Sequence, residues 1–151
     1  MRPPPARACR TPRPACTDAV SFNSKSLPPP TDAESARIAQ AKDFGCICCW
    51  KYNGMRVPGE YNHVLVGGLR VSHRAGFVIC PWHHRGVCRE GWNSTAMKNV
   101  YGPSLAKGSA VFHAVFGSDQ ELINYEDEMI GWPDRIKLDG ASKIVPRSTA
   151  A

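Results

Sequence analysis

Apolar residues are scarce in the first 31 positions of this chain and fall into short patterned runs after them. The stretch AESARIAQAKDF at 33–44 predicts a helix, which Thr31 or Asp32 can cap. Gly45 would end this helix, because glycine readily adopts the conformation found at helix ends. The helix has few apolar residues, so we expect it to lie on the surface of the domain.

Two more helices are predicted toward the C-terminal end of the patterned region. Segment 104–117 begins with Ser104 as a cap and ends at Gly117. Its apolar face, at helical spacing, consists of Leu105, Val111, Phe112, Val115 and Phe116. The sequence SDQE at 118–121 is a capping box for a second helix that ends near Gly131. We expect both helices to pack against the core.

Between the first helix and these two, the pattern changes to short apolar runs separated by glycine and proline, which is typical of strands and turns. We predict a tight cysteine-rich turn at 46–52, strands at 55–57, 60–66 and 77–80, and loops at 69–76 and 83–102. Gly67 and Gly68 form a turn, and Pro81 ends the last strand. The pattern therefore predicts an α+β domain with a small sheet.

Composition divides the chain into three parts. Residues 1–31 are rich in proline and arginine and contain one acid, Asp18, so we expect a disordered basic arm. This arm is either a dispensable leader or a grip on DNA or on a protein partner. Residues 32–131 form the folded domain, and 132–151 form a polar basic tail. The net charge of +6 favours a polyanionic partner such as nucleic acid, although it is also compatible with solubility alone.

Seven cysteines limit the compartment in which the chain is expected. Residues 1–30 lack the apolar segment of a secretory signal, and no stretch approaches the ~20 apolar residues of a membrane span. We therefore expect reduced thiols in a cytosol, some of them metal ligands, and no contact with a membrane.

Two pairs of residues have the spacing of a zinc site. Cys46 and Cys49 form a C-x-x-C turn, and Cys80 and His83 form a second turn of the same spacing. Each turn places two donors on one side of a tight loop, and two such turns supply the four ligands that structural Zn²⁺ requires. A redox pair at Cys46 and Cys49 is the alternative, and the second turn argues against it.

Other cysteines widen this ligand set. Cys48 is a candidate to replace Cys46, and Cys88 is a candidate additional ligand.

Histidines surround this pattern. His63 ends a predicted strand, and His84 directly follows the second zinc turn. If zinc holds both strand ends together, these two side chains come near each other. One could then act as a general base and the other could hold a divalent metal, and phosphodiester hydrolysis needs both. Taken singly, each histidine is more simply explained as a structural or solvent-facing residue.

Arginines flank the same region at Arg70, Arg74 and Arg85, with Arg89 as a further candidate. A guanidinium pairs with phosphate in a forked geometry, so these side chains could seat a DNA backbone. A solvated charged loop is the alternative.

Three segments, NHVLVGGLRVSHR, CPWHHRG and GPSLAKGSAVFHAVFGSDQELI, resemble the Ref family of phage-encoded, RecA-dependent endonucleases. The family belongs to the HNH, or ββα-metal, nucleases, and the resemblance covers roughly residues 45–125. It implies a small zinc-stabilised ββα-metal core with flanking helices. It also implies that cleavage of DNA requires a RecA filament and takes place in the cytoplasm of a bacterial host, for a protein encoded by a phage or prophage.

The resemblance also implies roles for individual residues. His63 matches the general base, and His84 matches a ligand of the catalytic Mg²⁺ or Mn²⁺. His73 lies near the middle position of the motif, where it would orient the base or assist the metal. Asn62 matches the position before the base and departs from the Asp or His that is often found there. A neutral amide is a weaker ligand for Mg²⁺ than a carboxylate.

Two other functions fit parts of the pattern. A non-catalytic, zinc-stabilised DNA-binding or adaptor module shares every basic and zinc feature with the nuclease. A thiol redox protein built on Cys46 and Cys49 is a weaker alternative. His63 separates the first alternative from the nuclease, because an adaptor has no need of an imidazole at that position.

Overall fold

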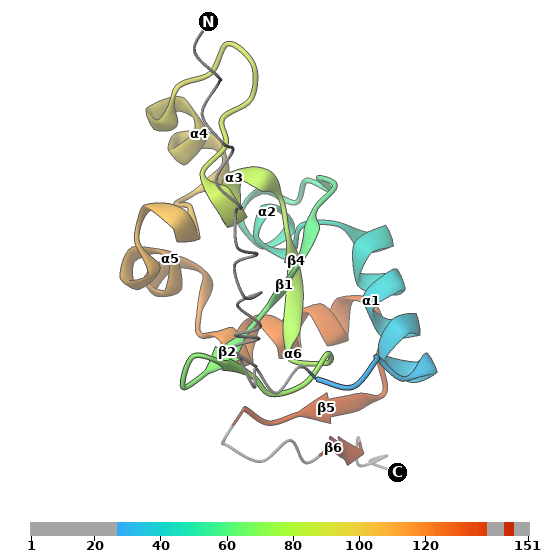
Figure 1. Ribbon diagram of the computed structural model, residues 1–151. Coiled ribbons are helices and arrows are strands. Elements are labelled where there is room, and N and C mark those ends of the chain that lie inside the picture. The colour runs from blue at the N-terminus through green and yellow to red at the C-terminus, as the bar shows by residue number, and fades with distance from the viewer. Residues whose placement is uncertain (1–26, 139–143, 147–151) are drawn as a thin grey trace, which may run out of the picture.

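The computed structural model describes residues 27–138 and 144–146. Most of the basic arm that we predict to be disordered therefore lies outside the described residues. The fold mixes helices with small two-stranded sheets, which confirms the α+β class (Figure 1). The elements are α1 (Asp32–Phe44), α2 (Ile47–Asn53), β1 (Glu60–His63), β2 (Leu65–Val66), β3 (Leu69–Arg70), β4 (Gly76–Ile79), α3 (Pro81–Arg85), α4 (Ser94–Tyr101), the 3₁₀ turn η1 (Leu105–Lys107), α5 (Ser109–Phe116), α6 (Asp119–Met129), β5 (Asp134–Ile136) and β6 (Ile144–Pro146).

An antiparallel ribbon of β1 and β4 occupies the middle of the molecule (Figure 1). Its register places Glu60 opposite Ile79 at one end and His63 opposite Gly76 at the other. Helix α1 contacts both strands of the ribbon, and α6 contacts β4. At the end of the ribbon near Glu60, β4 leads directly into α3.

The expected turn at Gly67 and Gly68 is confirmed. Both glycines have positive φ, 59° and 79°, and they join β2 to β3 in a short hairpin. A pair of residues with positive φ matches the twist of the flanking strands, which is why glycine suits both positions. The hairpin interrupts the predicted strand 60–66, so that β1 ends at His63.

Helix α1 starts and stops where its sequence signals lie. The Thr31 side chain accepts from the Glu34 backbone N–H, and the Glu34 carboxylate accepts from the Thr31 backbone N–H. Gly45 ends the helix with a φ of 97°. The expected surface location is wrong on one side of the helix, because Arg37 and Ala41 are completely buried.

Three helices, α2, α3 and α4, form in segments that we predict to be a turn or a loop. Segment 46–52 is largely helix α2, with Cys46 as its cap, and segment 83–102 contains most of α3 and all of α4. Asn93 caps α4 by accepting from the Ala96 backbone N–H, a local signal present in the sequence. No strand forms at 55–57. These helices are too short to show a clear apolar period, so packing decides them.

The two C-terminal helices are confirmed with changes. The expected helix at 104–117 is split at Gly108 into η1 and α5, and only Phe112 and Phe116 of its predicted apolar face are fully buried. Val111 and Val115 are exposed. Helix α6 has the predicted capping box at Ser118.

The core lies between the ribbon, α2, α5 and α6. Its largest completely or almost completely buried apolar side chains are Ile47, Phe77, Ile79, Phe112, Phe116, Leu122, Ile123 and Ile136. Ile136 comes from β5, so the start of the polar tail contributes to the core. No helix in the described part of the chain is long and apolar enough to cross a membrane.

Candidate functional site

The four residues of the two predicted zinc turns meet in the buried interior. Nδ1 of His83 lies 3.3 Å from Sγ of Cys46, 3.6 Å from Sγ of Cys49 and 3.2 Å from Sγ of Cys80. Sγ atoms of Cys49 and Cys80 are 3.8 Å apart. Ligands of tetrahedral zinc lie about 3.5–3.8 Å from one another, given bonds of about 2.0–2.3 Å. This cluster could therefore hold a zinc ion.

The local backbone places the four candidate ligands close together. Cys46 and Cys80 precede the first turns of α2 and α3, so each turn presents its two donors from one helix start. The Cys49 backbone N–H donates to Sγ of Cys46 at 3.4 Å. Burial raises the pKa of the Cys46 thiol, but hydrogen bonds with the other thiols and His83 outweigh it and bring the pKa well below its usual value. The thiolate form that results is the form that binds metal.

Residues around the cluster hold the His83 ring in place. Its Nε2–H donates to the Tyr101 carbonyl at 2.9 Å, so Nδ1 is the ring nitrogen that faces the thiols and could bind a metal. The rings of Phe112 and Phe116 meet the imidazole edge to face. Cys48 is buried and Cys88 lies near Ser94, and neither belongs to the cluster. The two alternative ligands are thus not needed to complete a set of four.

His63 and His73 lie together at the far end of the ribbon. Their ring centroids are 5.8 Å apart, and the Tyr61 ring contacts His63 edge to face at 5.1 Å. Nε2 of His63 is buried without a hydrogen-bond partner among the described residues. Burial, together with the neighbouring Arg70 and His73, lowers the pKa of His63 below its usual value, which favours the neutral ring. Nε2–H of His73 donates to the Pro28 carbonyl at 2.8 Å.

His84 belongs to a different group. Its Nδ1 lies 3.2 Å from Oε2 of Glu60, and Nη2 of Arg85 donates to Oε1 of the same carboxylate at 2.8 Å. Glu60 and His63 are three positions apart on β1, which corresponds to about 10 Å of strand. The contact found for His84 is with Glu60, and among the described residues His63 contacts Tyr61 and His73.

The alternation of side chains along β1 decides how the His63 group and the Glu60 group lie relative to each other. Side chains at successive positions of a strand point to opposite faces, so Glu60 and Asn62 share one face of β1, and Tyr61 and His63 share the other. Asn62 therefore adjoins the candidate base in sequence while facing the same way as Glu60. Among the described residues, the cluster of Cys46, Cys49, Cys80 and His83 is the only group of three or more His, Cys, Asp or Glu side chains close enough to share an ion.

The predicted arginines differ in their surroundings. Arg70 is exposed on β3, and Arg85 is exposed at the end of α3. Arg74 is almost completely buried, and its guanidinium donates to both carboxylate oxygens of Asp127 at 3.1 and 3.0 Å. Its prediction as a phosphate contact loses support from this burial.

Comparison with protein families supplies the classification. A family described as recombination enhancement, RecA-dependent nuclease matches residues 30–131, which is more than half of the chain. This chain belongs to that family. The family resemblance noted in the sequence is thereby confirmed. A search of the curated proteins found no match.

Membership of the RecA-dependent nuclease family connects the protein to recombination, to a DNA substrate and to RecA. Sequence reasoning named His63, His73 and His84 but missed Glu60. The signal that could have found it is the alternation of β1, which puts a carboxylate two positions before Asn62 on the same face.

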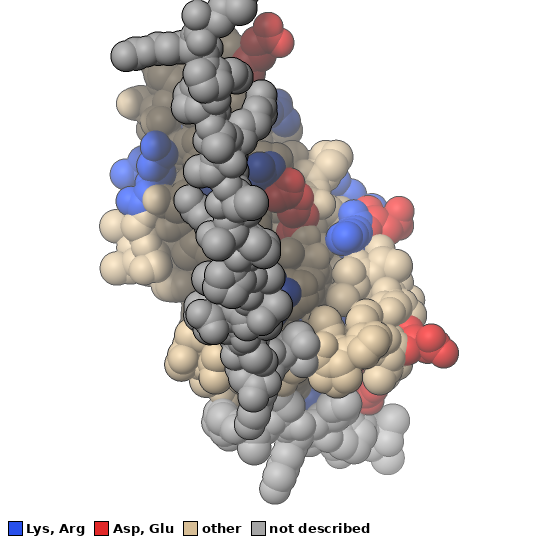
Figure 2. Space-filling model, viewed as in Figure 1, with Lys and Arg blue, Asp and Glu red and all other residues tan. Residues whose placement is uncertain are grey.

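A groove beside α3 was also missed. Its volume is about 490 Å³, and it is lined by residues of α3, α4, η1 and α5, including Lys98, Lys107, Ser94 and Asn99. No Asp or Glu contributes to its lining. Figure 2 shows basic side chains on this side of the molecule, beside α3 and near α5. The groove is therefore a mostly apolar hollow whose lining contains two lysines and no acidic residue.

Proposed function

We propose that this RecA-dependent nuclease is a metal-dependent DNA endonuclease of the HNH type, acting in phage recombination on DNA held in a RecA filament. The family match supports the nuclease class and the link to RecA. The observation that carries the finer proposal is the arrangement on β1. A neutral imidazole with an unpartnered nitrogen, His63, ends a strand that begins with a carboxylate in contact with His84. The catalytic unit corresponds to residues 32–131.

Two metals have separate sites in this proposal. Cys46, Cys49, Cys80 and His83 fit a structural Zn²⁺ by donor type and spacing. Glu60 and His84 offer a carboxylate oxygen and an imidazole nitrogen 3.2 Å apart, which suits two neighbouring positions around a divalent ion.

Mg²⁺ or Mn²⁺ commonly retains water in its remaining positions, so a pair of protein ligands is enough. Asn62 faces the same side and can add a neutral oxygen. The bound ion would supply positive charge that stabilises the leaving oxygen.

The chain's own residues perform the proton transfer and the alignment. Nε2 of His63 accepts a proton from the attacking water, which requires the neutral ring that its lowered pKa provides. His73 packs against this ring and limits its rotation. Arg70 and Arg85 are exposed cations on either side and would contact the phosphates. The groove with Lys98 and Lys107 gives the backbone a second positive contact beyond α3.

The test is a nicking assay on circular single-stranded and supercoiled DNA, with RecA, ATP and Mg²⁺ or Mn²⁺ present or omitted. Wild type is expected to cut only when RecA and a divalent ion are present. His63→Ala should bind DNA and retain zinc but lose cutting by about 100-fold or more, the usual contribution of a general base. His113→Gln on α5, remote from the ribbon, is the matched control and should cut normally.

A second variant tests the metal pair. Glu60→Gln keeps the size of the side chain and removes its charge, so it should raise the Mn²⁺ concentration needed for half-maximal cutting. A direct Mn²⁺ titration of the protein should show the same weakening without DNA. If neither wild type nor variants cut under any condition while all bind DNA, the adaptor function replaces the nuclease. If cutting persists in His63→Ala, the HNH mechanism is wrong.

A further inference from the structure

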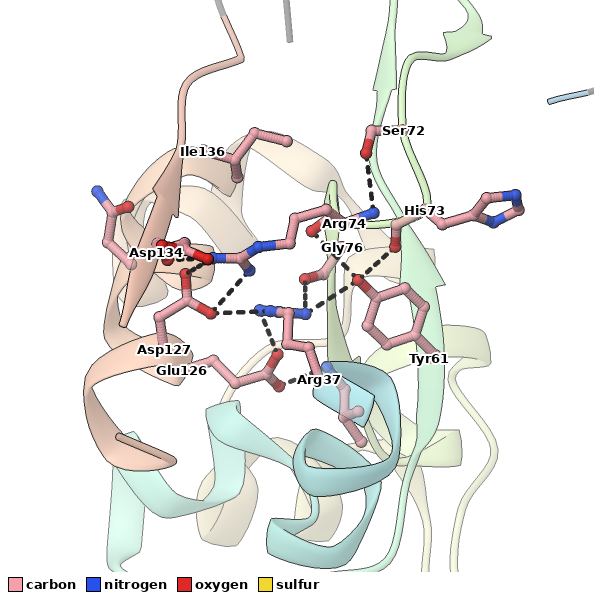
Figure 3. Close-up of polar contacts among 12 residues, drawn as sticks. Arg37, Tyr61, Ser72, His73, Arg74, Gly76, Glu126, Asp127, Asp134 and Ile136 are labelled. Carbon is pink, nitrogen blue, oxygen red and sulfur yellow. Dashed lines mark hydrogen bonds and ion pairs between the residues drawn. The ribbon is translucent and has the colours of Figure 1, made fainter. Parts of the chain in front are cut away.

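A buried polar network around Arg37 reaches Tyr61 on β1 and, through it, the His73 backbone (Figure 3). Its centre is Arg37 on α1, which has no exposed surface. The Arg37 guanidinium donates to Oε2 of Glu126 at 3.0 Å, to Oδ1 of Asp127 at 2.8 Å and to the Tyr61 hydroxyl oxygen at 3.0 Å. The network therefore joins α1 and α6 to a side chain of β1.

The same network holds the loop that carries His73. Arg37 donates to the Gly76 carbonyl at 3.1 Å, and Arg74 donates to Asp127. The Tyr61 hydroxyl donates to the His73 carbonyl at 2.9 Å, with the Arg74 carbonyl at 3.3 Å. In Figure 3 the His73 imidazole points away from the network while its carbonyl faces Tyr61. The backbone of His73 is thus held by Tyr61, while its imidazole points away from the network and donates to the Pro28 carbonyl at 2.8 Å.

Tyr61 is the member of this network that also touches His63. Its ring meets the His63 imidazole at 5.1 Å and 85°, and His63 in turn meets His73 at 5.8 Å. Burial raises the pKa of Tyr61 despite the opposing charge of Arg37, so the hydroxyl keeps its proton. The hydroxyl can therefore donate to the His73 carbonyl while it accepts from Arg37. One side chain positions one histidine by its ring and the other by its hydroxyl.

We propose that Tyr61 is a positioning residue for the candidate base: its ring aligns His63 and its hydroxyl aligns His73, and the buried Arg37 holds the side chain in place through that hydroxyl. This inference rests on the proposed role of His63. The hydroxyl is not needed to attach the ribbon to the helices. Arg37 still binds the Gly76 carbonyl, and the Val78 backbone N–H still donates to Oε1 of Glu126 at 2.7 Å. Loss of the hydroxyl should therefore disturb the loop of His73 more than the fold.

The experiment compares the full-length wild type with Tyr61→Phe, which removes only the hydroxyl. Tyr125→Phe is the matched control, because Tyr125 lies on α6 and has no hydroxyl hydrogen bond among the described residues. Each zinc-loaded protein is labelled with ¹⁵N in its histidine rings, and the ring signals are recorded by NMR. Thermal unfolding and steady-state nicking of RecA-coated DNA are measured on the same samples.

Positioning predicts three results together for Tyr61→Phe. The ring signals of His63 and His73 shift or broaden while those of His83 and His113 stay in place. The kcat for nicking falls about 10- to 100-fold with KM unchanged, as expected for a misplaced catalytic group. The unfolding temperature stays within a few degrees of wild type. Tyr125→Phe should match wild type in all three measurements.

Unchanged His63 and His73 signals, or an unchanged kcat, would overturn the proposal. If wild type itself does not nick DNA, the proposed function fails, and the ring signals alone decide whether Tyr61 positions the histidines. If Tyr61→Phe does not fold, the wild-type Tyr61 hydroxyl proton is measured instead. Slow exchange of this proton with water supports the buried hydrogen bond to His73, and fast exchange rules it out.

Discussion

His63 combines a neutral ring with a buried nitrogen that has no hydrogen-bond partner in the described part of the chain. Buried polar atoms are almost always paired, and exceptions in native proteins are often functional. The neutral state has two origins. Burial removes water that would stabilise the imidazolium, and the positive charge of Arg70 and the proximity of His73 disfavour the imidazolium further. The lowered pKa of His63 is thus a property of the folded chain, because its causes come from β3 and the following loop as well as from the ribbon.

The electrostatic part of this effect can be tested at Arg70. Arg70→Gln removes a nearby positive charge, so the pKa of His63 should rise. Because the neutral ring is the active form of a base, the acidic limb of the kcat/KM profile for nicking should move to higher pH. An NMR titration of the free protein should show the same upward shift, independently of any effect on DNA binding.

Arg89→Gln is the control for this prediction, since Arg89 lies over the Tyr101 ring, away from His63. Its acidic limb should coincide with that of wild type. A limb that stays in place in Arg70→Gln, or moves to lower pH, would contradict the electrostatic account.

At the scale of elements, α6 does more than bury apolar side chains. Alongside Leu122 and Ile123 it buries Glu126 and Asp127, which bind Arg37 on α1 and Arg74 in the loop before β4. Burying charges in this way is tolerable only when the partners are complete, because an unpaired buried charge is very costly. The network therefore makes the position of α1 depend on α6.

Removal of the Asp127 carboxylate tests whether the position of α1 depends on α6. Asp127→Ala leaves two buried guanidinium groups without one of their partners and is expected to lower the free energy of unfolding by about 3–5 kcal/mol. Urea denaturation followed by circular dichroism measures the change.

Glu128→Ala provides a neighbouring comparison on the exposed side of the same helix. Its effect should stay within about 0.5 kcal/mol, as for most surface substitutions. Equal effects of the two variants would show that the network contributes little to stability.

For the whole molecule, the cluster of three cysteines and His83, which could hold a zinc ion, is the point where distant parts of the chain converge. It joins α2 to the end of β4 and the start of α3, and His83 ties it to the end of α4 through Tyr101. A domain of this size has a small core, and a structural metal is a common way to stabilise such a core. Folding and zinc binding should therefore be coupled.

This coupling predicts different outcomes for two cysteines. Wild type should contain one zinc per chain, and Cys49→Ser should lose that zinc together with cooperative thermal unfolding. Cys88→Ser, outside the cluster, should keep both. Metal analysis and calorimetry on the same samples make the comparison. Full zinc content in Cys49→Ser would remove Cys49 from the ligand set.

The sequence by itself determined the features that depend on neighbouring residues. The C-x-x-C and C-x-x-H motifs identified the four side chains that meet in the cluster, because two donors separated by two residues are brought together by their own turn of the chain. Thr31, Gly45 and the glycines of the hairpin marked ends and turns for the same reason. Helices α2, α3 and α4 escaped prediction because a helix of one or two turns has little periodicity to detect.

Only the tertiary structure decided which of the remaining side chains act together. Arg37 and Asp127 are 90 positions apart, so no local pattern shows that an arginine on a polar helix is buried by a carboxylate on another. For the same reason His84 contacts Glu60 instead of His63, and Arg74 faces the interior while Arg70 faces solvent. Local hydrogen bonds and spacing are set by the order of residues along the chain. Burial and long-range pairing are set by the way the elements pack.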